Sequence, residues 1–235
     1  MKDVAIIPLS NELELVIASD NSAAIGRKKL DAVQVDHSVT AYYATRVAYM
    51  DLLRIGARPK SIVLQNFTGD EAWEPYEKGV RQLLAETEYA DLPITGSTES
   101  NFTTLQSALG LTIVGTREKP VTKQKEIDEN TLFAVIGKPL VGHEALEQSE
   151  YIAPLFLFEQ LSKCRAVMDL VPVGSTGIQA EWQQLTGKKN SLASDLNVSQ
   201  SGGPATCFII AYDPQAQEEI ENLAGTYFHP IQLTE

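Results

Sequence analysis

Short apolar runs alternate with longer amphipathic stretches along this chain, and that alternation restricts the folds open to it. Over residues 37–57, apolar side chains recur at Val39, Tyr43, Val47 and Met50. Steps of three and four are the spacing of one helix face. Shorter apolar runs on both sides of this stretch have the length of strands. Strands and helices in both halves predict an α/β (α+β) fold.

The same patterns locate the other elements. The predicted strands are residues 4–9, 13–18, 33–35, 61–68, 109–116, 132–137, 205–211 and 227–233. The predicted helices are residues 37–57, 71–90, 154–163, 178–185 and 214–223. A strongly polar stretch at 118–130 is the best boundary candidate. It predicts two domains, residues 1–120 and 130–235.

Charge and composition narrow the function. The chain of 235 residues has a formal charge of −12, from 19 basic and 31 acidic side chains. This acidity argues against nucleic acid as a partner, because phosphate backbones are bound by clustered Lys and Arg. No apolar stretch approaches the roughly 20 residues of a membrane span, and the start lacks a signal-peptide core. Two cysteines, Cys164 and Cys207, fit a reducing cytoplasm better than a disulfide framework.

Three acidic residues lie where apolar elements end or turn. Asp20 closes one apolar run, Asp51 comes late in the predicted helix, and Glu99 follows Gly and Ser residues in a predicted loop. Carboxylates from separate elements suit Mg²⁺, a hard cation that shares oxygen ligands with substrate phosphates. We therefore predict Asp20, Asp51 and Glu99 as metal ligands. Two alternatives stay open: Asp20 as an ordinary turn residue, and Asp51 as a helix acid paired with Arg54.

Small-residue loops provide candidate sites for phosphate and substrate, because glycine lets backbone amides approach a ligand closely. The predicted phosphate-binding residues are Gly96, Ser97, Thr98 and Asn101. The predicted substrate-binding residues are Gly174, Ser175, Gly177, Ser201, Gly202 and Gly203. The loop at 174–177 leads into a predicted helix, whose N-terminal amides are a natural anion site. Each loop could equally be an ordinary tight turn.

Candidate catalytic residues are fewer. Asp51 and Asp169 are the acids that we predict to act in catalysis, Asp169 as a base or third metal ligand. His37, His143 and His229 are scattered and lack a partnered Ser or Cys motif, so we interpret them as cap or surface residues. The chain has no P-loop, no protein-kinase signature set and no Gly-x-Gly-x-x-Gly after a strand. If it uses ATP, metal and loop amides must hold the phosphates.

Four segments, taken in order, resemble a known superfamily. Ser19-Asp-Asn-Ser-Ala-Ala-Ile-Gly26 resembles its Asp-Asp-Ala-Ala-Val strand end, and Asp51-Leu-Leu-Arg-Ile-Gly-Ala-Arg-Pro59 resembles its Asp-Leu-Ala-Ala-Met-Gly-Ala-x-Pro. Thr95-Gly-Ser-Thr-Glu99 is similar to a Gly-Gly-(Asp/Glu)-Thr loop, and Ser175-Thr-Gly-Ile-Gln-Ala-Glu181 to Ser-Asp-Gly-Leu-x-x-Glu. The superfamily, called PurM-like, contains aminoimidazole ribonucleotide synthetase, thiamine-monophosphate kinase, selenophosphate synthetase and the hydrogenase-maturation dehydratase. The resemblance implies a two-domain fold, ATP and Mg²⁺, and a homodimer whose N-terminal strands join into one barrel.

The chain departs from the general pattern at Asn21, Thr98 and Thr176, where the superfamily usually has acids. With these departures it looks most like the α-ribazole kinases. That resemblance implies an ATP-dependent phosphotransferase with an alcohol-group acceptor, the 5′-hydroxyl of the nucleoside-like α-ribazole, in salvage of the lower ligand of cobalamin. One alternative is thiamine-monophosphate kinase or a ring-closing ligase of the superfamily. Another is a non-catalytic nucleotide sensor or scaffold.

Overall fold

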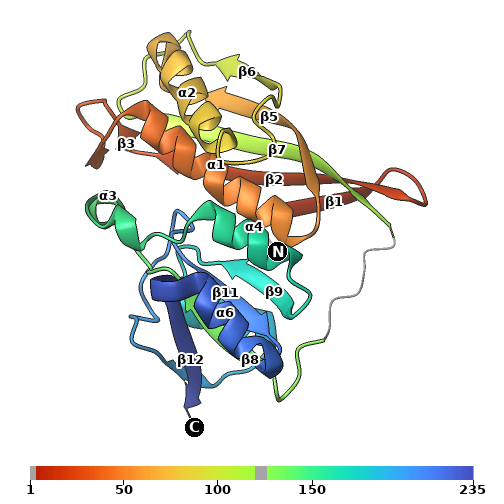
Figure 1. The fold of residues 1–235 in the computed structure, drawn as a ribbon. Coiled ribbons are helices and arrows are strands. Elements are labelled where there is room, and N and C mark those ends of the chain that lie inside the picture. The colour runs from red at the N-terminus through yellow and green to blue at the C-terminus, as the bar shows by residue number, and fades with distance from the viewer. Residues whose placement is uncertain (1–3, 120–125, 235) are drawn as a thin grey trace. The chain divides into compact units, whose positions relative to one another are not determined.

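The computed structural model describes residues 4–119 and 126–234. The chain divides into two compact units, Met1–Thr122 and Lys123–Glu235. Each unit contains its own five-stranded sheet with its own helices (Figure 1). Among the described residues, no helix combines the length and the apolar character that crossing a membrane requires.

The sheet of the first unit has the strand order β1-β2-β7-β5-β6. Its strands are β1 (Val4–Pro8), β2 (Leu13–Ala23), β7 (Ala108–Glu118), β5 (Arg58–Asn66) and β6 (Ile94–Thr98). Strands β5 and β6 are parallel, and the other neighbours are antiparallel. Ser10 stabilises the turn between β1 and β2, because its hydroxyl accepts hydrogen bonds from the amides of Glu12 and Leu13, both at 3.1 Å.

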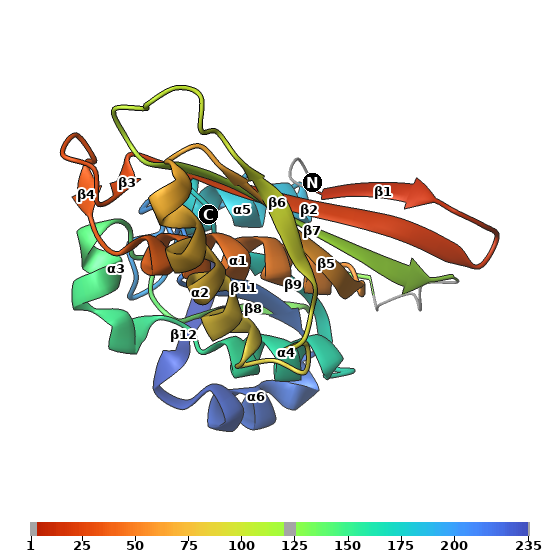
Figure 2. The same cartoon turned by 90° about the horizontal axis from the view of Figure 1, so that it is seen from above.

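Two helices cover one face of this sheet, α1 (His37–Arg54) and α2 (Trp73–Leu84) (Figure 2). Asp36 caps α1 by accepting the amide of Ser38 at 2.8 Å. Gly79 lets the two helices approach closely, since a β-carbon there would lie 2.0 Å from the carbonyl oxygen of Ser38. The unit also contains β3 (Ile25–Gly26), β4 (Val33–Gln34) and the 3₁₀ turn η1 (Asp70–Ala72).

The sheet of the second unit has the order β10-β12-β8-β11-β9, and all its neighbours are antiparallel. Its strands are β8 (Leu132–Ile136), β9 (Val167–Pro172), β10 (Ser191–Ala193), β11 (Phe208–Tyr212) and β12 (Phe228–Thr234). Its helices are α3 (His143–Glu147), α4 (Leu155–Lys163), α5 (Gly177–Thr186) and α6 (Gln217–Ala224). Three 3₁₀ turns complete it, η2 (Ser149–Tyr151), η3 (Pro214–Ala216) and η4 (Gly225–Tyr227).

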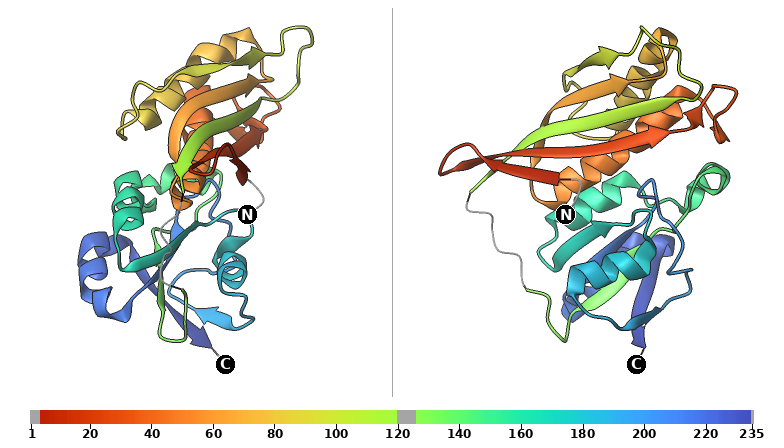
Figure 3. Two further views of the ribbon diagram at one scale, coloured as in Figure 1. Left: turned by 90° about the vertical axis from the view of Figure 1, so that its right-hand side faces the viewer. Right: turned by 180° about the vertical axis from the view of Figure 1, so that it is seen from behind.

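Helices cover both faces of this second sheet. Trp182 of α5 is fully buried and meets Phe133 edge-on, with the ring centroids 5.8 Å apart. Phe158 of α4 meets Phe208 in the same way, at 5.0 Å. Phe208 pairs with Ile136, so Phe208 and Phe133 point to opposite faces of the sheet. Each helix therefore closes its own apolar layer. The ribbon in Figure 3 shows the two helices on opposite sides of the sheet.

The prediction of a mixed α/β fold is confirmed, and the predicted elements correspond to observed ones apart from their ends. The sequence patterns did not predict β9, β10 or α3. A further difference is at residues 94–98, where β6 replaces the loop predicted around Gly96. Gly, Ser and Thr are typical of loops, but here they form an edge strand that pairs with β5. Another difference is α2, which ends at Leu84 rather than near residue 90. Of the two cysteines, Cys207 is buried and Cys164 is partly exposed.

Candidate functional site

Two small-residue loops of the second unit lie side by side. Residues 174–177 connect β9 to α5, and residues 201–206 lead toward β11. The amide of Gly202 donates to the carbonyl oxygen of Gly174 at 3.0 Å, and the amide of Val173 donates to Cys207 at 3.0 Å. The structure thus brings together all six residues that the sequence predicts for substrate binding. We call residues 174–177 and 201–206 the glycine cradle.

The glycines of the cradle have two different roles. At Gly202 a β-carbon would lie 2.8 Å from Cγ1 of Val173, and at Gly177 it would lie 2.9 Å from the carbonyl oxygen of Gln200. Gly177 also has a φ of +81°. These two glycines are required by packing and backbone conformation. Gly174 and Gly203 have more room, with nearest neighbours at 3.4 Å and 3.6 Å, so packing alone does not require glycine at these two positions.

Hydrogen bonds of Thr206 hold the cradle in place. It is fully buried, and its hydroxyl accepts the amide of Leu140 at 2.9 Å and lies 2.9 Å from the carbonyl oxygen of Lys138, to which it donates. Its own amide donates to Gly202 at 2.8 Å. One buried threonine therefore ties the loop after β8 to the cradle, and a rigid support of this kind holds binding groups in position.

The N-terminus of α5 is already hydrogen-bonded within the protein. The amide of Gly177 donates to Gly174 at 3.3 Å, and the amide of Gln179 donates to Val198 at 2.9 Å. An anion at a helix N-terminus needs amides that are free to donate. The expected anion site at this helix is therefore occupied in part by the protein's own carbonyl groups.

Asp169 lies outside the cradle. It is on β9 opposite Ala211, and its carboxylate accepts the amide of Leu170 at 2.8 Å. Three residue steps of strand separate it from the end of β9 at Pro172, about 10 Å at ~3.3 Å per residue, and Gly174 lies two residues further along the chain. The structure does not bring Asp169 together with the predicted substrate-binding residues.

The three predicted metal ligands lie on different parts of the first unit. Asp20 on β2 belongs to a row across the sheet that runs through Leu111 and Leu64 to Gly96. Three strand spacings of ~4.8 Å place β6 about 14 Å from Asp20. Glu99 directly follows β6. Asp20 and Glu99 are therefore too far apart to share one ion within a single chain.

Asp51 lies toward the opposite end of the sheet from Asp20. A β-carbon on Gly115 would lie 2.9 Å from Cδ1 of Leu52, the residue after Asp51. Gly115 pairs with Val16, four positions before Asp20 on the same strand, about 13 Å at ~3.3 Å per residue. Across residues 4–119 and 126–234, no group of three or more His, Cys, Asp or Glu side chains is placed to hold a metal ion. The predicted trio does not fit a metal centre within one chain.

Glu99 has a structural role. Its carboxylate accepts the amides of Asn101 at 2.7 Å and Phe102 at 3.3 Å, and its own amide donates to Asn66 at 2.8 Å. The acid therefore organises the turn that carries the chain away from β6, seen in Figure 2 as the arch between β6 and β7. Asn101 lies in this turn and not beside the glycine of β6.

The predicted phosphate-binding residues Gly96, Ser97 and Thr98 belong to β6. A β-carbon on Gly96 would lie 2.0 Å from the carbonyl oxygen of Leu64, so this glycine serves the contact with β5. The hydroxyl of Thr98 accepts Nδ2 of Asn66 at 3.1 Å. Because β6 is an edge strand, only one side of its backbone is paired with a neighbouring strand. The exposed side of this strand is the part that a ligand could contact.

A buried polar cluster near the start of α1 was not predicted from the sequence. Asp31 is 7% exposed and accepts hydrogen bonds from the amide of Lys28 at 2.8 Å and from Ser107 twice at 2.7 Å. Burial raises the pKa of Asp31, but the hydrogen bonds from Ser107 and Lys28 outweigh it and leave the pKa lowered. A single Asp in a polar loop carries no sequence signal that distinguishes it from a solvated acid.

His37 adjoins this cluster. It is 5% exposed, and its ring lies 5.2 Å from that of Tyr76. Among the described residues, its Nδ1 atom has no hydrogen-bond partner. Burial lowers the pKa of His37, against the opposing charges of Asp36 and Asp31. The expectation of a cap or surface residue is wrong, because Asp36 is the N-cap of α1 and His37, the first residue of the helix, is buried.

Searches for similar proteins find no matching family model and no matching curated protein. Solved structures do match. A Thermotoga maritima PurL structure complexed with ATP matches with a TM-score of 0.63 and 12% identity over 98% of this chain. Thiamine-monophosphate kinases match too, from Aquifex aeolicus (TM-score 0.65, 12% identity) and Stenotrophomonas maltophilia (0.61, 14%).

The extents of these matches differ. The alignment covers 42% of the PurL chain, but 89% and 85% of the two kinases. The three alignments cover 98%, 100% and 97% of the present chain, so each alignment includes both units. Identities of 12% to 14% carry information about the fold and not about the reaction. This chain has the PurM-like fold.

Proposed function

We propose that this protein is an ATP-dependent small-molecule kinase. The observation that carries the proposal is the fold match, over 97% to 100% of this chain, to structures whose names include an ATP complex and two thiamine-monophosphate kinases. In this proposal residues 1–120 bind ATP and residues 130–235 bind the acceptor. The protein works in the cytoplasm as a homodimer.

The proposed reaction is phosphoryl transfer to an alcohol. The acceptor oxygen forms a bond to the γ-phosphorus of ATP as the bond from that phosphorus to the bridging oxygen breaks. ADP leaves with the bonding electrons, and the hydroxyl proton passes to solvent. Such transfer requires alignment and charge neutralisation more than covalent chemistry from the protein. The rigid cradle around Thr206 suits the alignment of an acceptor.

The acceptor that we favour is the 5′-hydroxyl of α-ribazole, an uncharged riboside. Thr176 stands where the superfamily pattern has an acid, and the cradle backbone at Gly174 and Gly203 is flanked by the hydroxyls of Ser175 and Ser201. Hydroxyls and amides pair well with sugar hydroxyls, whereas an anionic phosphomonoester is better met by metal or Arg.

Mg²⁺ enters this proposal with ATP, as part of the co-substrate. Asp20 and Asp51 remain separate candidates for contact with the nucleotide's metal, since the acids do not converge within one chain. The exposed edge of β6 at Gly96 and Ser97 remains the candidate contact for the phosphates.

Two other functions remain as alternatives. The first is thiamine-monophosphate kinase, which the names of two matching structures favour. The second is a non-catalytic nucleotide sensor, which the separation of Asp20, Asp51 and Glu99 favours, because an idle protein need not keep a metal centre.

One set of experiments separates the three. Isothermal titration with Mg-ATP measures nucleotide binding, and mass spectrometry of reactions with α-ribazole or thiamine monophosphate identifies any product. The kinase proposed here yields α-ribazole 5′-phosphate. A diphosphate product from thiamine monophosphate alone would select the first alternative, and Mg-ATP binding without product from any acceptor would select the sensor. Absence of Mg-ATP binding would overturn all three.

A further inference from the structure

The side chain of Glu181 lies over the glycine cradle. It comes from α5, and its Oε1 atom is 2.8 Å from the hydroxyl oxygen of Thr176. The same oxygen is the nearest neighbour of the β-carbon position on Gly174, at 3.4 Å. The hydroxyl of Thr176 donates this hydrogen bond, so it holds the carboxylate beside the backbone at Gly174. Glu181 is partly exposed, and thus accessible to a bound molecule.

A second carboxylate lies beside the other loop of the cradle. Glu144 on α3 accepts Nε2 of Gln200 at 2.8 Å, and Gln200 directly precedes Ser201. The ammonium group of Lys138, whose carbonyl group binds Thr206, lies 3.6 Å from the ring centre of Tyr151. This lysine is thus engaged by an aromatic ring. One carboxylate therefore lies near each loop of the cradle, Glu181 from α5 and Glu144 from α3.

These contacts make the cradle unfavourable for a phosphate. The first-turn amides of Gly177 and Gln179 already donate within the protein, and the carboxylate of Glu181 lies near the positive end of the helix, where an anion would bind. A phosphomonoester would meet like charge from Glu181 and Glu144. A ligand hydroxyl would instead bind favourably here, because it donates a charge-assisted hydrogen bond to a carboxylate.

We propose that Glu181 determines acceptor specificity by accepting a hydrogen bond from a hydroxyl of an uncharged, polyhydroxylated acceptor, and that Thr176 positions it. This inference rests on the proposed function and adds the residue that selects neutral acceptors over phosphorylated ones. A site built to pair a substrate hydroxyl discriminates strongly, because a ligand lacking that group leaves a polar atom unpaired.

The test begins with direct binding, which does not depend on turnover. Titration calorimetry would compare wild-type protein with Glu181→Gln and Thr176→Val, using α-ribazole and thiamine monophosphate as probes. Loss of a hydrogen bond to a charged group weakens binding by about 10- to 100-fold. We expect a loss in this range for α-ribazole with Glu181→Gln, a smaller loss with Thr176→Val, and tighter binding of thiamine monophosphate with Glu181→Gln.

Controls separate specificity from folding. Glu218→Gln removes one exposed carboxylate from α6 of the same unit and should leave both affinities unchanged. Thr176→Ser retains the hydroxyl and should restore binding lost in Thr176→Val. The Kd for Mg-ATP and the thermal midpoint should match wild type in all variants. A change in KM for the acceptor without an equal change in kcat would agree with a binding role.

The outcomes for the two proposals are distinct. If α-ribazole binds equally to wild type and Glu181→Gln, or does not bind to wild type, the role of Glu181 is refuted. If α-ribazole binding depends on Glu181 and no ATP is consumed, the kinase function fails and the assignment of Glu181 as a hydroxyl-binding residue stands.

Discussion

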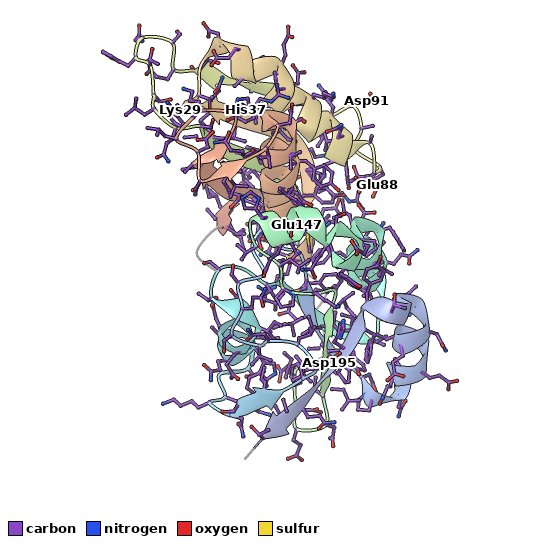
Figure 4. The ribbon with its side chains drawn as sticks, turned by 90° about the vertical axis from the view of Figure 1, so that its left-hand side faces the viewer. Lys29, His37, Glu88, Asp91, Glu147 and Asp195 are labelled. Carbon is purple, nitrogen blue, oxygen red and sulfur yellow. The ribbon has the colours of Figure 1, made fainter. Side chains whose placement is uncertain are left out.

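Asp31 and Ser107 are joined by two hydrogen bonds, one from the backbone amide of Ser107 and one from its hydroxyl, each 2.7 Å long. They connect the segment before α1 to the residue before β7, although 76 positions separate the two residues in sequence. Both are buried, Ser107 completely. This pair of hydrogen bonds lies at the end of the first unit that also contains His37. In Figure 4, Lys29 and His37 mark that end, away from Glu88 and Asp91.

Removing the Asp31 carboxylate should destabilise the protein. Asp31→Ala leaves the buried amide and hydroxyl of Ser107 without an acceptor, at a cost of about 1–3 kcal/mol for each unsatisfied group. We expect the free energy of unfolding to fall by at least ~2 kcal/mol, measured by urea denaturation. Asp91→Ala is the matched control, because Asp91 is exposed, and it should change stability by less than ~0.5 kcal/mol. Equal effects of the two substitutions would contradict this account.

Stability should decrease as the pH falls through the range set by His37. Burial lowers the pKa of His37 in the folded protein below the unfolded value of about 6.5. Below that value the unfolded chain binds more protons at this site than the folded protein, so the free energy of unfolding falls with decreasing pH. Urea midpoints between pH 5 and 7.5 would measure the slope.

A His37→Asn variant separates this effect from the titration of carboxylates. Asp31 and Asp36 have lowered pKa values, so their contributions are lost only at more acidic pH. The difference in stability between wild type and His37→Asn should therefore depend on pH in the range just below about 6.5, the unfolded value. A difference that is constant across this range would exclude His37 as its source.

Strand β1 should form part of a subunit interface. It is an edge strand, and Ile6 and Ile7 are 42% and 43% exposed. Exposed apolar edges invite pairing with another chain unless they are covered. We expect a homodimer that uses residues of the first 35, and sedimentation equilibrium at micromolar concentration would detect it. Ile6→Lys should shift the protein toward monomer; Glu88→Lys, an exposed charge change away from the strands, should not. A wild-type monomer with full activity would contradict the prediction.

Asp51→Asn should abolish ATP turnover and leave the thermal midpoint nearly unchanged. The substitution preserves size and removes the charge that could contact the metal of Mg-ATP. We expect turnover to fall by more than about 100-fold, a loss of ~2.7 kcal/mol of transition-state stabilisation. Glu99→Gln should behave differently, with a smaller loss of turnover, because its main contacts are the amides of Asn101 and Phe102. A folded Asp51→Asn protein with wild-type rate would refute the role of Asp51.

Local sequence patterns were sufficient for most of the secondary structure. The three- and four-residue spacing from Val39 to Met50 predicts α1, and Asp36 caps it as helix N-caps require. Both cradle loops were predicted to bind the substrate, but not the contact that joins them: the hydrogen bond between Gly174 and Gly202 links segments of the chain 28 positions apart, which no local pattern encodes.

The sequence by itself determined most of the helices and longer strands, though not β6 or β9, and which loops are rich in glycine, because periodicity and turn chemistry act between near neighbours. The tertiary structure decided the rest. Pairing with β5 made Gly96 part of a strand, and the strand order placed Asp20 and Glu99 on opposite sides of two intervening strands. The fold of the loop before α5 brought Glu181 over Gly174. These outcomes depend on hydrogen bonds and packing between distant segments, whose partners are settled only when the whole sheet forms.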